Sequence, residues 1–287
     1  MAIFDAAYAT PTFSFRIRTP LVDVAHRLDE LLEPFGCQNP NGGPTYELRA
    51  HPSGRVDVYI DSTLVLRSNT SAAAFDYVLW SVSTETIERA SEFLVLHAGA
   101  LSWRRRGIIL PAPPDAGKTT LTAGLVRAGF RYLSDEAAFV DPTTAMLQPF
   151  PRPLWMDLST INMMRGLLER LPEFLRAPRV SFHVAPTELR SGSIGSPCRI
   201  RFVIAPNYVR NAETRLEPLG RAEAVVLLAR NSFNAASRGA AGIELLTRIV
   251  EGARCFRLVM GDLESAVDAV GRLAKGSDRS MHGSATT

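Results

Sequence analysis

Lys118 closes the stretch Ala112-Pro-Pro-Asp-Ala-Gly-Lys-Thr119, whose residue types can hold a polyphosphate. The chain has 32 basic residues, and only Lys118 and Lys275 are lysine. A lysine ammonium is a compact point charge that fits between two phosphates, where a planar guanidinium would not. Backbone N–H groups at a helix start converge on phosphate oxygens, and a Ser/Thr hydroxyl can ligate Mg²⁺. The predicted nucleotide-binding residues are Pro114, Asp115, Ala116, Gly117, Lys118, Thr119 and Thr120.

The stretch departs from the phosphate-loop pattern GxxxxGK[ST] at one position, because Ala112 replaces the first glycine. Alanine is tolerated there if its φ angle is negative and strained if φ is positive. The alternative is a chance Gly-Lys-Thr in a loop. The rarity of lysine, the apolar strand predicted over 107–110 and the helix predicted over 119–129 favour a nucleotide loop.

Asp135 and Glu136 follow a short strand predicted over 131–133. Alone, such a pair would be a solvated turn. Beside a phosphate loop, two acids can divide the labour between a metal ion and proton abstraction. His97 follows the apolar run 93–96, and we expect it to end a strand whose carboxyl edge also carries the acids. A lone histidine in such a place is more often a core residue.

The order strand, glycine-bearing loop, helix, strand and acidic pair predicts an α/β fold with a P-loop core. We divide the chain into a strand-rich N-terminal region (1–72), a P-loop core (73–275) and a disordered tail (276–287). Periodicity predicts helices over 21–32, 75–82, 159–168, 221–229, 240–251 and 262–273. It predicts further strands over 12–18, 55–61, 64–67 and 254–259.

With 287 residues and 46% hydrophobic content, the chain can bury a large core. The net charge of +3 comes from scattered arginines, and the run Arg104–Arg106 fits a solvated turn, so we expect no nucleic-acid partner. Neither a membrane span nor a secretory signal is indicated, which predicts a cytoplasmic protein. Three widely spaced cysteines indicate neither a disulfide framework nor a zinc site.

Together these residues resemble the HPr kinase/phosphorylase-related proteins, specifically the HprK-related kinase A group. The resemblance runs from about Phe75 to Ala274, and the order of its motifs is more specific than any single motif. The segments that carry it are 96–99, 110–120, 133–136, 151–153 and 223–234. HPr kinases share a P-loop core with the phosphoenolpyruvate carboxykinases and transfer the γ-phosphate of ATP to a serine of a protein.

The resemblance implies a role for each site residue. Asp135 would take the proton of the acceptor serine, and His97 would tune it. Glu136 and Thr119 would hold Mg²⁺. Arg152, in Pro-Arg-Pro, would contact the substrate. The implied partner is a protein or peptide, for which a product of the same gene cluster is a candidate, and oligomers are common among such relatives.

Other departures leave a second interpretation open. The family loop resembles Gly-Pro-Pro-Gly-Ser-Gly-Lys-Ser, whereas Asp115 here brings a negative charge near the polyphosphate. The relatives also have a lysine near the position of Asp157. The chain could therefore be a pseudokinase that binds nucleotide or peptide as an interaction module. A kinase for small molecules of the carboxykinase type is a third interpretation.

Overall fold

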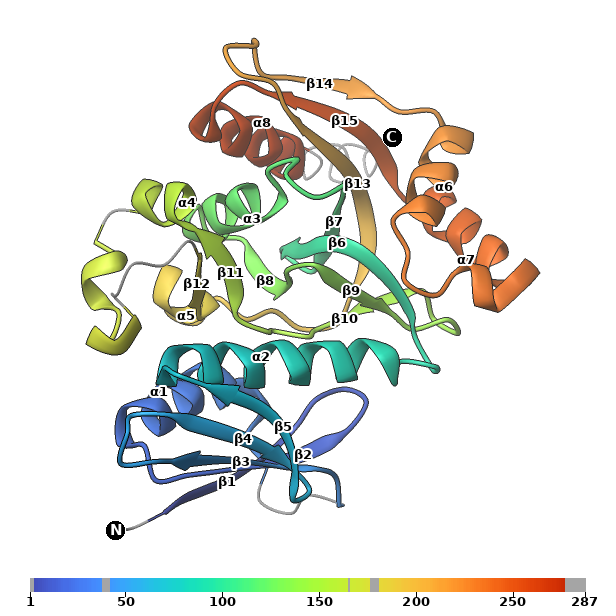
Figure 1. Cartoon of the computed structure of the whole chain (residues 1–287). Helices are drawn as coiled ribbons and strands as arrows, with labels where there is room; N and C mark the ends of the chain where they lie inside the picture. Colours follow the sequence, from blue (N-terminus) through green and yellow to red (C-terminus); the bar gives the residue numbers. More distant parts are fainter. Residues whose placement is uncertain (1–2, 38–41, 165, 176–180, 277–287) are drawn as a thin grey trace, which may run out of the picture. The chain divides into compact units, whose positions relative to one another are not determined.

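The computed structural model describes residues 3–37, 42–164, 166–175 and 181–276. The chain forms two compact units (Figure 1). The first unit comprises Met1–Ser91 and Arg152–Ala185, and the second comprises Glu92–Pro151 and Pro186–Thr287. The predicted boundary falls at residue 72, whereas the first compact unit includes residues up to Ser91. All but the first residue of the predicted tail lies outside the described residues.

The first unit contains a five-stranded sheet in the order β1-β2-β3-β4-β5. The strands and the two helices beside them are β1 (Phe4–Ala9), β2 (Ser14–Thr19), α1 (Val22–Leu32), β3 (Thr45–Ala50), β4 (Val56–Ile60), β5 (Thr63–Ser68) and α2 (Ser71–Glu88). Only β2 and β3 are parallel, and α1 lies in the connection between them, as a parallel crossover requires.

Alternating side chains give this sheet one buried face. Phe15 and Ile17 of β2 are buried, as are Tyr46 and Leu48 of β3. The intervening residues carry charge, and Arg18 pairs with Asp5 across β1 and β2 at 2.9 Å. The sheet is therefore amphipathic, which agrees with the predicted alternation.

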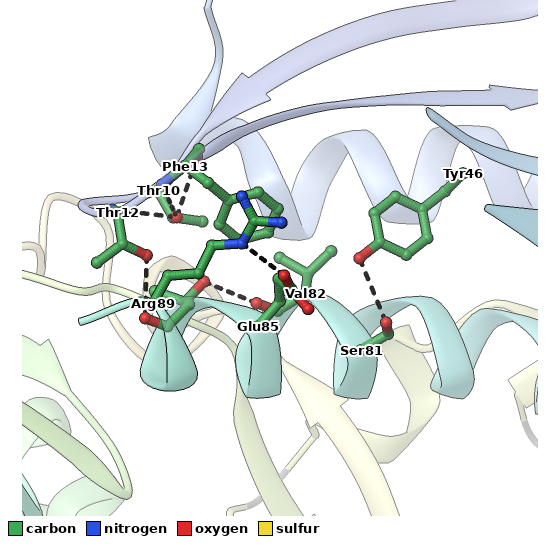
Figure 2. Close-up of polar contacts among 9 residues, drawn as sticks. Thr10, Thr12, Phe13, Tyr46, Ser81, Val82, Glu85 and Arg89 are labelled. Carbon is green, nitrogen blue, oxygen red and sulfur yellow. Dashed lines mark hydrogen bonds and ion pairs between the residues drawn. The ribbon is translucent and has the colours of Figure 1, made fainter. Parts of the chain in front are cut away.

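Polar contacts fix the C-terminal half of helix α2 to the N-terminal strands and their connection (Figure 2). Its N-cap Thr70 accepts a hydrogen bond from the backbone N–H of Ala73. The hydroxyl of Thr12 donates to the carbonyl of Thr86 at 2.9 Å, and the hydroxyls of Tyr46 and Ser81 lie 3.2 Å apart. The first contact caps the start of the helix, and the other two hold its middle and its C-terminal end to the N-terminal strands and their connection.

A two-stranded sheet completes the first unit, with β11 (Leu154–Asp157) antiparallel to β12 (Ser181–Val184). Asp157 caps the next helix, α4 (Leu158–Met163), because its carboxylate accepts from the backbone N–H of Thr160 at 2.6 Å. The predicted helix over 159–168 is too long by five residues, because α4 ends before Gly166, whose φ of 74° breaks a right-handed helix.

The second unit contains an eight-stranded mixed sheet in the order β10-β9-β6-β7-β13-β15-β14, with β8 also paired to β6. Its strands are β6 (Leu94–Trp103), β7 (Arg106–Pro111), β8 (Arg131–Ser134), β9 (Ala137–Val140), β10 (Met146–Gln148), β13 (Cys198–Tyr208), β14 (Arg215–Pro218) and β15 (Arg254–Met260). β7, β13 and β15 run parallel, and the other pairings are antiparallel.

Helices cover both faces of this sheet (Figure 1). They are α3 (Lys118–Arg127), α5 (Pro186–Leu189), α6 (Arg221–Arg230), α7 (Gly239–Glu251) and α8 (Leu263–Gly276). Leu228 of α6 and Leu246 of α7 share a core with Leu96 and Ala98 of β6. On the other face, α3 packs against α8 and β6. The predicted helices at 119–129, 221–229, 240–251 and 262–273 are confirmed within a few residues.

Arg104 and Arg105 have φ angles of 47° and 62° and form the tight turn between β6 and β7, so the basic run is a turn as predicted. Cys198 is buried, whereas Cys37 and Cys255 are partly exposed, and all three thiols are free. Among the described residues, we find no helix with the length and apolar character needed to cross a membrane.

Phe15 provides a test of the first unit. Its ring is fully buried and lies 5.4 Å from Tyr8 and 5.9 Å from Tyr46, centroid to centroid. We expect Phe15→Ala to destabilise this unit by about 3 to 5 kcal/mol, because it leaves a cavity among aromatic rings. Calorimetric unfolding measures the change. Val22→Ala, at a site that is 58% exposed, is the control and should cost below about 0.5 kcal/mol. Equal effects would contradict this packing.

Candidate functional site

The loop after β7 has the backbone that the sequence pattern predicts. β7 pairs with β6 as far as Pro111 and then leaves the sheet. Gly117 precedes α3 in a left-handed conformation with φ of 85°, and a Cβ there would collide with Cε of Met260. Glycine is thus favoured by the positive φ, and any larger residue would also have to displace the methyl group of Met260. Ala112 is not among the residues with positive φ, so alanine is compatible with that position.

Lys118 lies within this loop. Its ammonium donates to the carbonyl oxygens of Ala112 at 2.7 Å and Pro113 at 2.9 Å, and the residue is only 8% exposed. Burial lowers the pKa of Lys118, while Asp135, Glu136 and Asp115 act in the opposite direction. A buried cation therefore stands among three carboxylates.

Asp135 connects to the start of α3. The hydroxyl of Thr119 donates to Oδ2 of Asp135 at 2.9 Å, and Asp135 is 4% exposed. A hydroxyl that donates to a carboxylate keeps its own lone pairs for another partner. The hydrogen bond places Asp135 directly beside the start of α3, where Thr119 follows Lys118 in the chain.

The acidic pair lies between two strands. β8 and β9 both pair with β6, with Ser134 opposite Ala100 and Ala137 opposite His97, and the β8 pairing shifts register between Ala100 and Leu101. The backbone N–H of Ala98 donates to the carbonyl of Glu136 at 3.1 Å, and Glu136 has φ of 76°. Positive φ is costly for a residue with a side chain and is often found at functional sites. The pair therefore interrupts a continuous strand in a strained conformation.

His97 does not end a strand, and that prediction is wrong. β6 runs from Leu94 to Trp103, so His97 lies near its start. The expectation that parallel strands bring His97 to the acids is also wrong, because β6 is antiparallel to β8 and β9. His97 is brought near Glu136 because it pairs directly with Ala137, rather than by parallel strands that end together.

The electrostatic surroundings of His97 link it to the loop. Burial lowers its pKa from the ordinary value of 6.5, and the cation of Lys118 lowers it further, whereas Glu136 raises it. The imidazole is therefore neutral near pH 7 and can both donate and accept a hydrogen bond.

The segment 231–234 holds the start of β6. The backbone N–H of His97 donates to the carbonyl of Asn231 at 2.8 Å, and that of Phe233 donates to Val95 at 2.9 Å. The amide of Asn234 accepts from the N–H of Val95 at 2.9 Å and donates to the carbonyl of Phe93 at 2.8 Å. This segment pairs with β6 next to the place where β7 departs. Its role as a positioning element was not predicted from the sequence.

Gly99 allows α3 to pack closely on β6. A Cβ on Gly99 would lie 2.6 Å from Oγ1 of Thr122, which is fully buried on α3. The small residue lets the helix approach β6 closely, and this approach brings the α3 N-terminus to the acids.

The oxygen atoms at this site suit a magnesium ion. Mg²⁺ prefers carboxylate, hydroxyl and phosphate oxygens and keeps several waters, so one or two protein ligands suffice. The Thr119 hydroxyl supplies one such oxygen, and Glu136, the predicted second ligand, follows Asp135 directly in the chain. In the described part of the chain, no group of three or more His, Cys, Asp and Glu side chains could hold a metal. Any ion here would depend on nucleotide phosphates for its remaining ligands.

The other predicted site residues lie in two places. Pro114 and Asp115 are exposed on the loop, and Ala116 and Thr120 are partly buried beside Gly117. Arg152 is 6% exposed and belongs to the first unit, so its contact with a substrate remains a prediction.

Comparisons with known proteins give a distant likeness. No family model matches the chain, and no curated protein matches it. A solved structure that matches is the Hpr(Ser) kinase/phosphatase from Coxiella burnetii, with a TM-score of 0.33 and 12% sequence identity. The match covers 67% of this chain and 99% of that one. The function of the site is therefore argued from its own geometry.

The His97 environment predicts opposite pKa changes in two variants. Lys118→Met should raise the pKa of His97, and Glu136→Gln should lower it, because each removes a charge that acts on the ring. An NMR titration of the imidazole measures both, with Asp262→Asn as the control. A depressed pKa means that the unfolded state binds the proton more readily. His97 should therefore weaken folding as the pH falls from 6.5 through its folded pKa. Shifts of the same sign in both variants would contradict this arrangement.

A second prediction tests the packing of α3 on β6 at Gly99. Gly99→Ala should destabilise the protein by about 1 to 3 kcal/mol through the clash with Thr122. The double variant with Thr122→Ala should recover part of the loss, since it removes the colliding oxygen. Gly271→Ala, on α8 with open space at its Cβ, is the matched control and should not destabilise. Chemical unfolding decides, and additive effects of the two substitutions would contradict the contact.

Proposed function

We propose that the protein is an ATP- and Mg²⁺-dependent kinase of the HPr kinase type that phosphorylates a serine or similar hydroxyl of a protein or peptide. The single observation that carries this proposal is the Thr119–Asp135 hydrogen bond beside the buried ammonium of Lys118. It joins a loop suited to phosphates with a carboxylate suited to an acceptor hydroxyl. Such a reaction draws on cellular ATP, which agrees with the proposed cytoplasmic location.

The chain's own groups would perform most of the chemistry by position and charge, as phosphoryl transfer requires. The backbone N–H groups of the loop and the ammonium of Lys118 would hold the β- and γ-phosphates. Lys118 would exchange its hydrogen bonds to Ala112 and Pro113 for phosphate oxygens. The loop thus keeps the ammonium in place before the substrate arrives.

Asp135 would accept the proton of the acceptor hydroxyl. It is 4% exposed, and it is one of the carboxylates that act on the ammonium of Lys118. His97, neutral at pH 7, would orient the acceptor or the carboxylate from the neighbouring strand. Thr119 and Glu136 would hold Mg²⁺, which would neutralise phosphate charge. The Thr119 hydroxyl is suited to this because its proton is already donated to Asp135.

A second function is favoured by Asp115. This exposed acid acts on the Lys118 ammonium and would repel a polyphosphate. A pseudokinase that binds a peptide, with or without nucleotide, would have the same fold. A thermal-shift titration with Mg·ATP separates the two, since ligand binding to the folded state raises the melting temperature. A working kinase is stabilised, and a loop that cannot bind is not.

The two lysines provide a matched pair of variants for the kinase test. Lys118→Met should lower phosphate transfer from γ-labelled ATP by about 100-fold or more, because it removes a charge that stabilises the transferring phosphoryl group. Lys275→Met should retain activity, since that ammonium lies on α8 beside the ring of Trp103. Acceptors are serine-containing peptides and small carrier proteins encoded near the gene. Transfer that survives Lys118→Met, or no transfer to any acceptor together with no Mg·ATP stabilisation, would contradict the proposal.

A further inference from the structure

Tyr208 borders the phosphate loop with a half-exposed ring. It is the last residue of β13, the parallel neighbour of β7, from which the loop departs. A Cβ placed on Gly117 would lie 3.7 Å from Cβ of Tyr208, so the two residues are adjacent. Tyr208 is nonetheless 52% exposed. An aromatic side chain is thus open to a ligand seated at the loop.

The backbone that presents this ring is fixed. Tyr208 pairs with Met260 in the parallel ladder of β13 and β15, and the backbone N–H of Val209 donates to Met260 at 3.0 Å. The next turn is closed by a hydrogen bond from Ala212 to Val209 at 3.0 Å. A Cβ on Gly261 would collide with the carbonyl of Ala212, so this turn packs tightly on the end of β15. The backbone that carries the ring is therefore fixed before any ligand binds.

The strand order places Tyr208 and the acidic pair on opposite sides of the phosphate loop. In the sequence β9-β6-β7-β13-β15, the loop leaves from β7 in the middle. His97 and the acidic pair lie on the β6 and β9 side, and Tyr208 lies on the β13 side. In-line phosphoryl transfer places the acceptor and the leaving nucleotide on opposite sides of the transferred group. If Asp135 serves the acceptor, the nucleoside extends toward β13.

We propose that Tyr208 stacks on the base of the nucleoside triphosphate whose phosphates the loop holds, an inference that rests on the proposed function. Stacking on an aromatic ring is tolerant of base identity, because every base has a π face. The ligand class is therefore a nucleoside triphosphate with weak discrimination between bases.

The test separates the base from the phosphates. Isothermal titration compares Mg·ATP with Mg·tripolyphosphate, which has the phosphates but no base, on the wild type and on Tyr208→Ala and Tyr208→Phe. We expect Tyr208→Ala to weaken Mg·ATP binding roughly 10- to 100-fold and to leave Mg·tripolyphosphate binding unchanged. Tyr208→Phe keeps the ring and should retain wild-type affinity for Mg·ATP. Val209→Ala, at the exposed neighbour, is the matched control and should change neither affinity.

Three results would overturn the inference. Tyr208→Ala could leave the affinity for Mg·ATP unchanged, or it could weaken both probes equally, which indicates distortion of the loop. Either result, with tripolyphosphate binding that is lost in Lys118→Met, refutes the role of Tyr208 and leaves the phosphate loop intact. If the wild type binds neither probe, the proposed kinase function fails together with the inference.

Discussion

The hydrogen bond from Thr119 to Asp135 is the contact on which the site depends, because it joins two elements that are separate in the sequence. One partner opens α3, and the other interrupts the strand formed by β8 and β9. Their distance is set by the close approach of α3 to β6 at Gly99. A shift of either element would move the carboxylate away from the loop, and the groups proposed to bind phosphate and to accept a proton would no longer share one site.

Charge and burial act together around this contact. Lys118 is nearly excluded from water, and burying an isolated ammonium is costly. Loop carbonyls and three nearby carboxylates offset that cost. The same ammonium lowers the pKa of His97, so the imidazole stays neutral although an acid lies nearby. The cluster therefore combines a buried ammonium, three acidic side chains that act on it and a neutral imidazole.

Much of the loop could be predicted from the sequence, because its conformation follows from local residue types. Gly117 and Lys118 indicate a left-handed turn and a helix start, and both are present. The extent of β6 could not be predicted, since Ala98, Gly99 and Ala100 have low strand propensity. They belong to a strand because small residues are needed under α3, which is a tertiary requirement. β13, which mixes arginines with an apolar run, was likewise not predicted and forms the centre of the parallel group.

Hydrogen–deuterium exchange of the loop amides tests the central claim most directly, because it observes the backbone N–H groups that would hold the phosphates. The account predicts that Mg·ATP slows exchange over 114–120 in the wild type and leaves it unchanged in Lys118→Met. Protection confined to other segments, or equal exchange with and without Mg·ATP in the wild type, would contradict it.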